Sequence, residues 1–452
     1  MRAAGGLAAA LAGGFAICLA AGGCAPERRD WNVVVLLVDT LRADHLGAYG
    51  YQRPTSPNLD AFAAANVVFA DHRSQSPCTF PSANSILTSR APQHFDGRAA
   101  GDHGIPDGMP TLAEVLEARG YATLAVSASP IVRATPSRLN EVGGFGRGFH
   151  LFLERCEWRR AACVHNDAFT YLPLLRRPFF LYLHYMDAHA PYQPPDWYRR
   201  RFATDLDDAP AWVRKGDPKP IADMVYREAP GEIDQAHLRS LIDLYDDSIG
   251  FFDEQFALLL DKLEENDAIE NTLIAVIADH GESFLEHAHV LHCRTLYEPE
   301  IRTPWLMRVP GLDGPVRIDG PSANLDVVPT ILDLLGEDLA PHGFEGRSLR
   351  RAVERGQPVA GPVFAAWGRL GSATDGRHKL IADRKARTVA LYDLAADPGE
   401  ERDLADLDPE TLRRLAGELT AWRHAVEQGR PEVDAPTGET IEERLQALGY
   451  LR

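Results

Sequence analysis

Residues 32–39 read NVVVLLVD, an unbroken apolar run that ends in an acid. Valine-rich runs of this kind are typical of strands buried on both faces, as in parallel sheets that are covered by helices on either side. Residues 271–279 repeat the pattern, because NTLIAVIA is followed by Asp279. The two runs predict two buried strands, each of which delivers a carboxylate at its carboxyl end.

Strands and helices are expected to alternate around these two runs. The pattern predicts further strands at residues 66–70, 121–127, 179–184 and 301–309 and helices at residues 111–120, 237–265 and 324–336. The helix at 111–120 opens with a capping box, in which Thr111 is followed three residues later by Glu114. This alternation predicts an α/β fold with a parallel or mostly parallel sheet and helices on both faces.

The chain is long enough for a large α/β domain and a smaller one. It has 452 residues, and its composition turns loop-rich after about residue 338. Beyond that point the sequence predicts short strands at 363–367, 378–382 and 389–393 and a charged helix at 409–427. The net charge of −18 argues against binding nucleic acid or an anionic membrane surface, which requires a basic face.

Residues 1–24 have the pattern of a secretory signal. Arg2 precedes an apolar run that ends in small residues just before Cys24. The ending AAGGC resembles a bacterial lipoprotein cleavage box with Cys24 as the lipidated residue; a simple signal peptide and an uncleaved anchor are the alternatives. No later stretch is apolar enough to span a membrane. We therefore expect export across a bacterial inner membrane to the periplasmic face or the cell surface, with tethering to the membrane only through this N-terminal segment.

Residues 76–90, SPCTFPSANSILTSR, contain the predicted nucleophile, Thr79. Pro81 and Ser82 are expected to start a helix directly after it, because proline is favoured in a first helical turn and serine is a good capping residue. A hydroxyl at that place faces the positive end of the helix dipole, where an anionic ester is favoured. The alternative is an ordinary capped surface helix.

Three residues are predicted to bind one metal ion. Asp39 and Asp279 follow buried strands that end at the same edge of a sheet, and His280 adds a ring nitrogen. Gly281 lets the backbone approach closely. With the hydroxyl of Thr79, this set of ligands suits Mn²⁺ or Zn²⁺ better than Ca²⁺, which remains the alternative. For Asp39 taken alone, capping of the next turn is the other interpretation.

A second group of polar residues is expected near the same edge. The strand at 179–184 ends in His184, and Asp187 and His189 follow before a proline-rich loop. We predict that His184 and His292 take part in catalysis, and that Asp187, His189 and Arg294 bind substrate. A second metal ion on Asp187 and His189 is an alternative.

Six cysteines are present. Cys156 and Cys163 are close enough in sequence for a small disulfide in an oxidising compartment, and two buried thiols are the alternative. Cys78 and Cys293, which flank the predicted site, are interpreted as small apolar packing residues.

Several stretches in order resemble the sulfatase family of the alkaline phosphatase superfamily from about residue 32 to the C-terminus. They are VVLLVDTLRADHLGAYGY, SPCTFPSANSILTSR, PFFLYLHYMDAHAPYQPP, IADHGESF, HCRTLYEPEIRTPW, NLDVVPTILDLLG and LYDLAADPGEERDL. The resemblance implies an α/β/α sandwich as a catalytic domain over residues 31–338 and a smaller C-terminal α+β subdomain, a sheet and a helix, over residues 339–452. It also implies a divalent cation on Asp39, Asp279 and His280, against which Thr79 attacks an anionic ester.

The chain departs from the family pattern at the residues that decide the chemistry. Sulfatases carry Cys-x-Pro-x-Arg, whose cysteine becomes formylglycine; here Thr79 stands two residues before Pro81, and Ala83 replaces the arginine. Thr40 replaces a second acid, and His280 replaces a common asparagine. Formylglycine chemistry is therefore not expected, and the threonine form resembles the phosphate-ester hydrolases and phosphoryl transferases of the superfamily.

These observations predict a metal-dependent hydrolase of sulfate or phosphate esters that uses Thr79 and a covalent intermediate. The expected substrate is a small anionic ester or a glycan or lipid head group. Two alternatives are a phosphoryl-group transferase and a pseudoenzyme that only binds an anionic glycan or head group.

Overall fold

The computed structural model describes residues 28–95, 104–105, 108–137, 139–140, 143–158, 160–203, 206–227 and 232–429. The predicted leader and Cys24 lie outside the described residues. Within the described ranges, no helix combines the length and the apolar character needed to cross a bilayer.

An eight-stranded sheet forms the centre of the molecule, in the order β10-β2-β9-β6-β1-β5-β3-β4. Strand β1 (Asn32–Val38) is completely buried and pairs in parallel with β5 and β6. Strand β9 is antiparallel to both neighbours, and the other pairs are parallel. The other strands are β2 (Val67–Arg73), β3 (Ala122–Ser127), β4 (Leu151–Leu153), β5 (Phe179–Tyr185), β6 (Thr272–Ile277), β9 (Trp305–Arg308) and β10 (Val316–Ala323). A short hairpin joins β7 (Ser283–Phe284) and β8 (Val290–Leu291).

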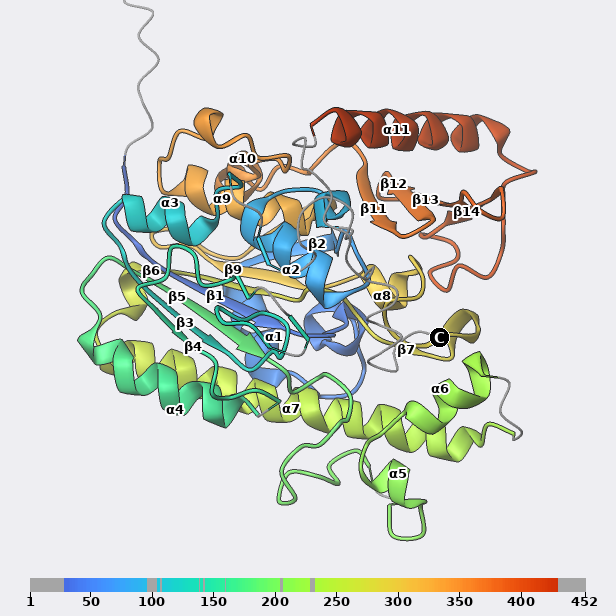
Figure 1. Cartoon of the computed structure of the whole chain (residues 1–452), viewed down its shortest axis with the longest axis horizontal. Coiled ribbons are helices and arrows are strands. Elements are labelled where there is room, and N and C mark those ends of the chain that lie inside the picture. Colours follow the sequence, from blue (N-terminus) through green and yellow to red (C-terminus); the bar gives the residue numbers. More distant parts are fainter. Residues whose placement is uncertain are drawn as a thin grey trace, which may run out of the picture.

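Helices cover both faces of this sheet (Figure 1). Helices α1, α4 and α7 contribute to the apolar core on one face, and α2, α3, α9 and α10 contribute to the core on the other. Their bounds are α1 (Pro57–Ala65), α2 (Thr79–Thr88), α3 (Leu112–Ala118), α4 (Ala161–Tyr171), α7 (Gln235–Glu265), α9 (Val327–Leu334) and α10 (Arg350–Arg355). The short helices α5 (Ala211–Arg214), α6 (Lys219–Tyr226) and α8 (Glu298–Ile301) lie in connecting segments. The predicted α/β/α sandwich with a mostly parallel sheet is confirmed.

A four-stranded antiparallel sheet and one long helix form the C-terminal part. The sheet has the order β11-β12-β13-β14, and helix α11 packs on it. The bounds are β11 (Val363–Trp367), β12 (Leu370–Thr374), β13 (His378–Asp383), β14 (Thr388–Asp393) and α11 (Pro409–Gln428). This is the small C-terminal sheet and helix that the sequence predicts. The domain boundary near residue 338 stays a prediction.

A buried charge cluster joins the two parts, and it consists of Arg73, Glu298, Lys379 and Glu400. The ammonium nitrogen of Lys379 lies 2.9 Å from Glu298 Oε1 and 2.8 Å from Glu400 Oε1. The guanidinium of Arg73 donates to both carboxylate oxygens of Glu298, at 2.8 and 2.9 Å. Because a buried charge is costly without a partner, these four groups bind the C-terminal sheet to the end of β2.

Some helices and strands were not predicted from the sequence, among them strands β4, β10 and β12 and helix α4. The strand expected at 301–309 is shorter than predicted, because residue 301 ends α8 and the strand β9 begins at Trp305. Strand β10 has exposed polar positions and an irregular register around Gly320 and Pro321, as edge strands often do. It therefore lacks the continuous apolar run that identifies β1 and β6.

Candidate active site

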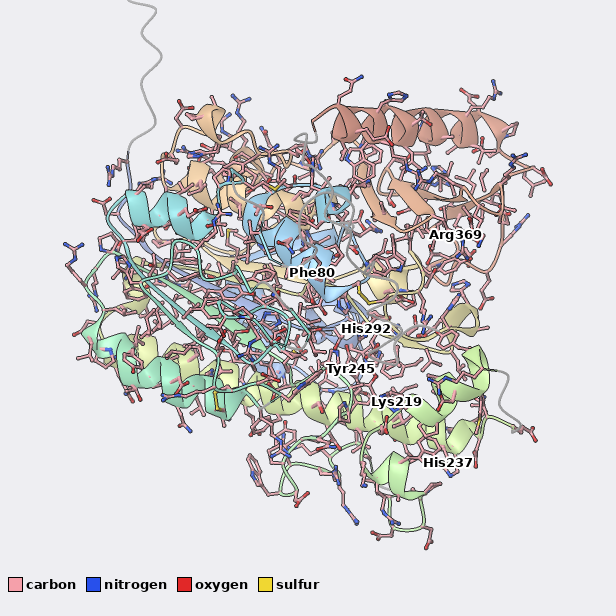
Figure 2. The ribbon with its side chains drawn as sticks, viewed as in Figure 1. Phe80, Lys219, His237, Tyr245, His292 and Arg369 are labelled. Atoms are coloured by element: carbon pink, nitrogen blue, oxygen red, sulfur yellow. A yellow bond between two sulfur atoms is a disulfide. The ribbon has the colours of Figure 1, made fainter. Side chains whose placement is uncertain are left out.

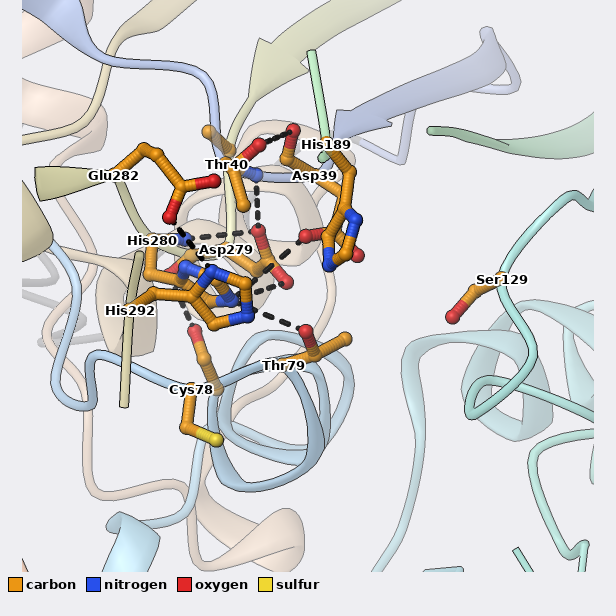
Figure 3. Close-up of polar contacts among 12 residues, drawn as sticks. Asp39, Thr40, Cys78, Thr79, Ser129, His189, Asp279, His280, Glu282 and His292 are labelled. Atoms are coloured by element: carbon orange, nitrogen blue, oxygen red, sulfur yellow. Dashed lines mark hydrogen bonds and ion pairs between the residues drawn. The ribbon is translucent and has the colours of Figure 1, made fainter. Parts of the chain in front are cut away.

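The carboxyl ends of the two adjacent strands β1 and β6 bring Asp39 and Asp279 together. With His280, they offer ligand atoms that all lie within 4.8 Å of one another (Figure 3). All three side chains are buried. The predicted convergence of two strand-end acids and one histidine is therefore present in the structure.

One oxygen of each acid has no hydrogen-bond partner among the described residues, namely Asp39 Oδ1 and Asp279 Oδ2. Burial raises the pKa of Asp39 to about 6. Burial, followed by the charge of Asp39, raises the pKa of Asp279 to about 6. Two close carboxylates in a low-dielectric interior, each with an unsatisfied oxygen, are the environment that a divalent cation stabilises. The donor set therefore fits the predicted metal.

His280 presents its unprotonated nitrogen to these oxygens. Its Nδ1 lies 2.9 Å from the carbonyl oxygen of Gly281, to which only an N–H can donate. Nε2 is therefore the acceptor, and it lies 3.1 Å from Thr79 Oγ1, 3.4 Å from Asp279 Oδ2 and 3.7 Å from Asp39 Oδ1. A histidine whose other nitrogen donates to a backbone carbonyl is the usual form of a metal ligand.

Thr79 is the first residue of α2, so the helix begins at the predicted nucleophile and not after it as expected. Cys78 occupies the N-cap position, although its side chain makes no capping hydrogen bond. The hydroxyl of Thr79 points at His280 Nε2, at 3.1 Å. Ser82, one turn further, donates to the backbone oxygen of Asp279 at 2.6 Å and so ties α2 to the end of β6.

Thr40 connects the ends of three strands. Its backbone N–H donates to Asp279 Oδ1 at 3.2 Å, and its hydroxyl lies 2.7 Å from the backbone oxygens of Asp39 and Ala188. Thr40 adopts a positive φ of 60°, which is uncommon for a β-branched residue. Thr40, which stands where the family has a second acid, therefore contacts both Asp39 and Asp279.

Gly281 is close to the backbone of a neighbouring segment, as predicted. A Cβ at this position would lie 2.1 Å from the carbonyl oxygen of Pro299. The backbone N–H of Gly281 donates to the carbonyl oxygen of Glu300 at 2.8 Å. A side chain at this position would therefore collide with the backbone of Pro299.

Gly281→Ala is expected to destabilise the fold by about 1–3 kcal/mol, which is the usual cost of overpacking. Gly417→Ala is the matched control, because a Cβ on Gly417 in α11 meets open space and alanine is favoured in helices. Urea-induced unfolding of both variants measures the difference. Equal free energies of unfolding for Gly281→Ala and the wild type would contradict the close approach.

His292 also lies at the site, as predicted. Its Nδ1 lies 2.9 Å from Glu282 Oε1, and Tyr192 donates to Glu282 Oε2 at 3.0 Å. The ring centroid of His292 is 4.6 Å from that of His280 and 5.1 Å from that of His189. His292 is labelled near the middle of the view in Figure 2, its residue is 4% exposed, and burial lowers its pKa to about 3.

The remaining predicted residues have other neighbours. His184 Nε2 lies 3.5 Å from Asp39 Oδ2 while Nδ1 contacts the hydroxyl of Tyr182, so His184 lies behind Asp39 and does not line the pocket. Both oxygens of Asp187 accept from the backbone N–H of Ala161 at the start of α4. The guanidinium of Arg294 lies 4.1 Å from the ring centroid of Tyr226. Their roles in catalysis or substrate binding stay predictions.

The interpretation of Cys78 and Cys293 as packing residues is wrong. Their sulfur atoms form a disulfide that links segments 215 residues apart. Cys78 directly precedes Thr79 and Cys293 directly follows His292, so the bond connects the predicted nucleophile to the predicted catalytic histidine. Cys156 and Cys163 also form a disulfide, which resolves the alternatives that the sequence left open.

A pocket opens over this cluster. Its lining residues are Asp39, Cys78, Thr79, Ser129, Pro130, Ile131, Leu139, Trp158, Met186, His189, His292 and Cys293. Ser129 lies on a separate loop across from the cluster (Figure 3).

Two residues at the site, Glu282 and Trp158, were not predicted from the sequence. For Glu282, the available signal in the sequence is its place two residues after His280. For Trp158, the signal is its place between Cys156 and Cys163.

Known proteins resemble this chain in sequence and in fold. A family model described as Sulfatase matches residues 31–337. Human arylsulfatase A is 26% identical over 453 residues, which cover 85% of this chain and 86% of the relative.

Solved structures show the same fold. A phosphonate monoester hydrolase from Silicibacter pomeroyi superposes with a TM-score of 0.72 at 20% identity and covers 87% of this chain and 95% of its own. A 2-O GAG sulfatase superposes with a TM-score of 0.71 at 18% identity and covers 91% and 95%.

Proposed function

Because the chain belongs to the sulfatase family, we propose that its buried site hydrolyses a sulfate or phosphate ester with Thr79 as the nucleophile. The family and the fold indicate an ester hydrolase. The threonine nucleophile, the covalent intermediate and the choice between sulfate and phosphate are our proposal.

One observation carries the proposal. The hydroxyl of Thr79 points into the same space as His280 Nε2 and the unpartnered oxygens of Asp39 and Asp279. Cys78 holds the N-cap position, so the hydroxyl of Thr79 is not needed as a cap, and it faces the basic nitrogen of His280 beside the two acids. That arrangement suits a nucleophile held beside a cation.

Asp39, Asp279 and His280, with Thr79 Oγ1, would hold a divalent cation. Such a cation lowers the pKa of a hydroxyl and stabilises charge on the oxygens of an anionic ester. The two acids keep the charge of the site balanced, and the position of Thr79 at the positive end of α2 favours an anion in front of it.

The covalent step is an in-line displacement. The bond from Thr79 Oγ1 to phosphorus or sulfur forms as the bond to the leaving alcohol breaks, and water then releases phosphate or sulfate from Thr79. The hydrogen bond to Glu282 holds the proton of His292 on Nδ1, so Nε2 is its basic nitrogen. We assign this nitrogen to transfer the proton between Thr79 and the leaving group.

The test compares esters that share one leaving group. The purified chain is assayed on 4-nitrophenyl phosphate, bis(4-nitrophenyl) phosphate and 4-nitrophenyl sulfate, each with Mn²⁺, Zn²⁺ or Ca²⁺. Phosphate-ester turnover with Mn²⁺ or Zn²⁺ is the expected result. Tight metal binding without turnover of any ester would favour the pseudoenzyme, and transfer of phosphate to an added alcohol would favour the transferase.

Metal binding is expected to stabilise the fold as well as support turnover. At a metal concentration about 100-fold above Kd, one bound ion adds about 2.7 kcal/mol to the free energy of unfolding. Chelation should lower the thermal midpoint and abolish turnover, and Mn²⁺ should restore both. Asp279→Asn should lose the metal-induced shift, whereas Asp187→Asn should retain it. Loss of the shift in Asp187→Asn as well would point to a second ion on Asp187.

We also propose that the protein works outside the cytoplasm, tethered through its N-terminal segment. The proposal is supported by two disulfides beside the pocket, since such bonds persist in oxidising compartments. Labelling of Cys24 with a lipid precursor, and its loss in Cys24→Ala, would test the tether.

A further inference from the structure

We propose that Trp158 is a substrate-binding platform and that the leaving alcohol of the ester carries a flat ring. The inference rests on the proposed function, because Thr79 fixes where the reacting ester lies. Trp158 would determine specificity for the alcohol part of the substrate, which the metal site does not contact.

The pocket has both polar and apolar lining residues. Asp39, Thr79 and His292 are among the polar ones. The apolar ones include Pro130, Ile131, Leu139, Trp158 and Met186. An ester whose anionic group lies against Thr79 extends its alcohol part into this apolar region. Apolar walls of this kind favour a hydrophobic or ring-shaped group.

The loop that carries Trp158 is held at several points. The disulfide between Cys156 and Cys163 closes the loop around it. The backbone N–H of Trp158 donates to the carbonyl oxygen of Ala128 at 2.9 Å. Arg160, two residues on, donates to the backbone oxygen of Gln193 at 2.7 Å. The indole is therefore mounted on a rigid support beside the pocket, which reduces the entropy lost when a ligand binds.

Trp158 is neither buried nor conformationally relaxed. Its side chain is 45% exposed, and its φ of 55° is in the left-handed region that non-glycine residues rarely adopt. The indole packs edge-on against His189, with ring centroids 5.3 Å apart and an interplanar angle of 61°. Trp158 belongs to neither apolar core of the main sheet, and a ligand in the pocket would cover part of its exposed surface.

Stacking on an indole favours flat groups with an apolar face, such as an aromatic ring or the apolar face of a sugar ring. Aromatic pairs contribute enough to change binding by about 2- to 12-fold beyond the effect of buried area. A methyl group in the same position gains little from the indole. The other apolar lining residues also contact a ring, so the change in the ring-to-methyl ratio when Trp158 is replaced isolates the contribution of Trp158.

The experiment measures binding without turnover. Phenylphosphonate, glucose 6-phosphate and methylphosphonate are titrated calorimetrically into the Mn²⁺-loaded wild type, Trp158→Ala, Trp158→Phe and Trp197→Ala. Trp197 is the matched control, because it is 70% exposed and does not line the pocket. The wild type and Trp197→Ala should bind a ring ligand about 2- to 12-fold tighter than methylphosphonate. Trp158→Ala should lose that preference, and Trp158→Phe should keep part of it.

The result separates this inference from the proposed function. Preference for phenylphosphonate alone identifies an aryl group, and preference for glucose 6-phosphate identifies a sugar. An unchanged ring preference in Trp158→Ala, or equal affinity of the wild type for ring and methyl ligands, overturns the platform. A ring preference that depends on Trp158, in a protein that turns over no ester, leaves the platform in place and overturns only the hydrolase.

Discussion

Thr79→Ala is expected to lower kcat/KM on 4-nitrophenyl phosphate by about 10³- to 10⁶-fold, the range seen when an enzyme loses its nucleophile. The substitution removes the oxygen that lies 3.1 Å from His280 Nε2, while Asp39, Asp279 and His280 remain to bind the ion. We therefore expect metal-dependent thermal stabilisation to survive in large part although turnover is lost.

Thr88→Ala is the matched control for this experiment. Thr88 is also buried in α2, and its hydroxyl donates to the backbone oxygen of Asn84 at 2.7 Å. It should lower stability slightly and leave kcat/KM within a few-fold. Thr79→Ser, which retains a hydroxyl, should keep measurable turnover. Sulfate-ester turnover that survives Thr79→Ala would sink the threonine nucleophile and shift attention to water at the metal site.

Removing the Cys78–Cys293 disulfide is the second change with a large expected effect. The bond joins the residue before Thr79 to the residue after His292, and the backbone N–H of Cys293 also donates to the carbonyl oxygen of Pro77 at 2.8 Å. A displacement of about 1 Å between a nucleophile and its proton-transfer partner costs about 10²-fold in rate. We expect the double variant Cys78→Ser/Cys293→Ser to lose about 10- to 100-fold in kcat with a smaller change in KM.

The disulfide closes a long loop, so its loss also lowers stability, by up to about 5 kcal/mol in the chain-entropy model. Kinetics should therefore be measured at low temperature, with circular dichroism to show that the variant is folded. Cys156→Ser/Cys163→Ser is the control for kcat, because that bond closes a short loop and joins neither neighbour of Thr79 to His292; since the loop carries Trp158, its loss should change KM rather than kcat. A folded Cys78→Ser/Cys293→Ser variant with wild-type kcat would show that the disulfide has no positioning role.

The sequence predicts the centre of this molecule better than its periphery. Strand β1 and strand β6 are identifiable because burial on both faces leaves an unbroken apolar run, and the rule for strand ends then places Asp39 and Asp279 together. The capping box at Thr111 is a local signal, and the structure confirms it. Edge strand β10 carries no such run and was missed.

Long-range partners could not be predicted for a physical reason. Cys78 and Cys293 are 215 residues apart, and only the packed sheet brings their segments together, so no local pattern identifies the pair. The same holds for the contact of His184 with Asp39, which depends on the register between β1 and β5. Trp158 lies in a loop without periodicity, and its exposure over the pocket follows from tertiary structure alone.

The buried charge cluster limits how independently the two parts of this chain can evolve. Arg73 and Glu298 come from the larger part, and Lys379 and Glu400 come from the C-terminal part. Each part keeps one internal ion pair, Arg73 with Glu298 and Lys379 with Glu400, and the contact of Lys379 with Glu298 crosses between the parts. A chimera that combines the two parts from different relatives must therefore keep a positive group at position 379 opposite a negative group at position 298, because removing one partner of a buried pair is costly.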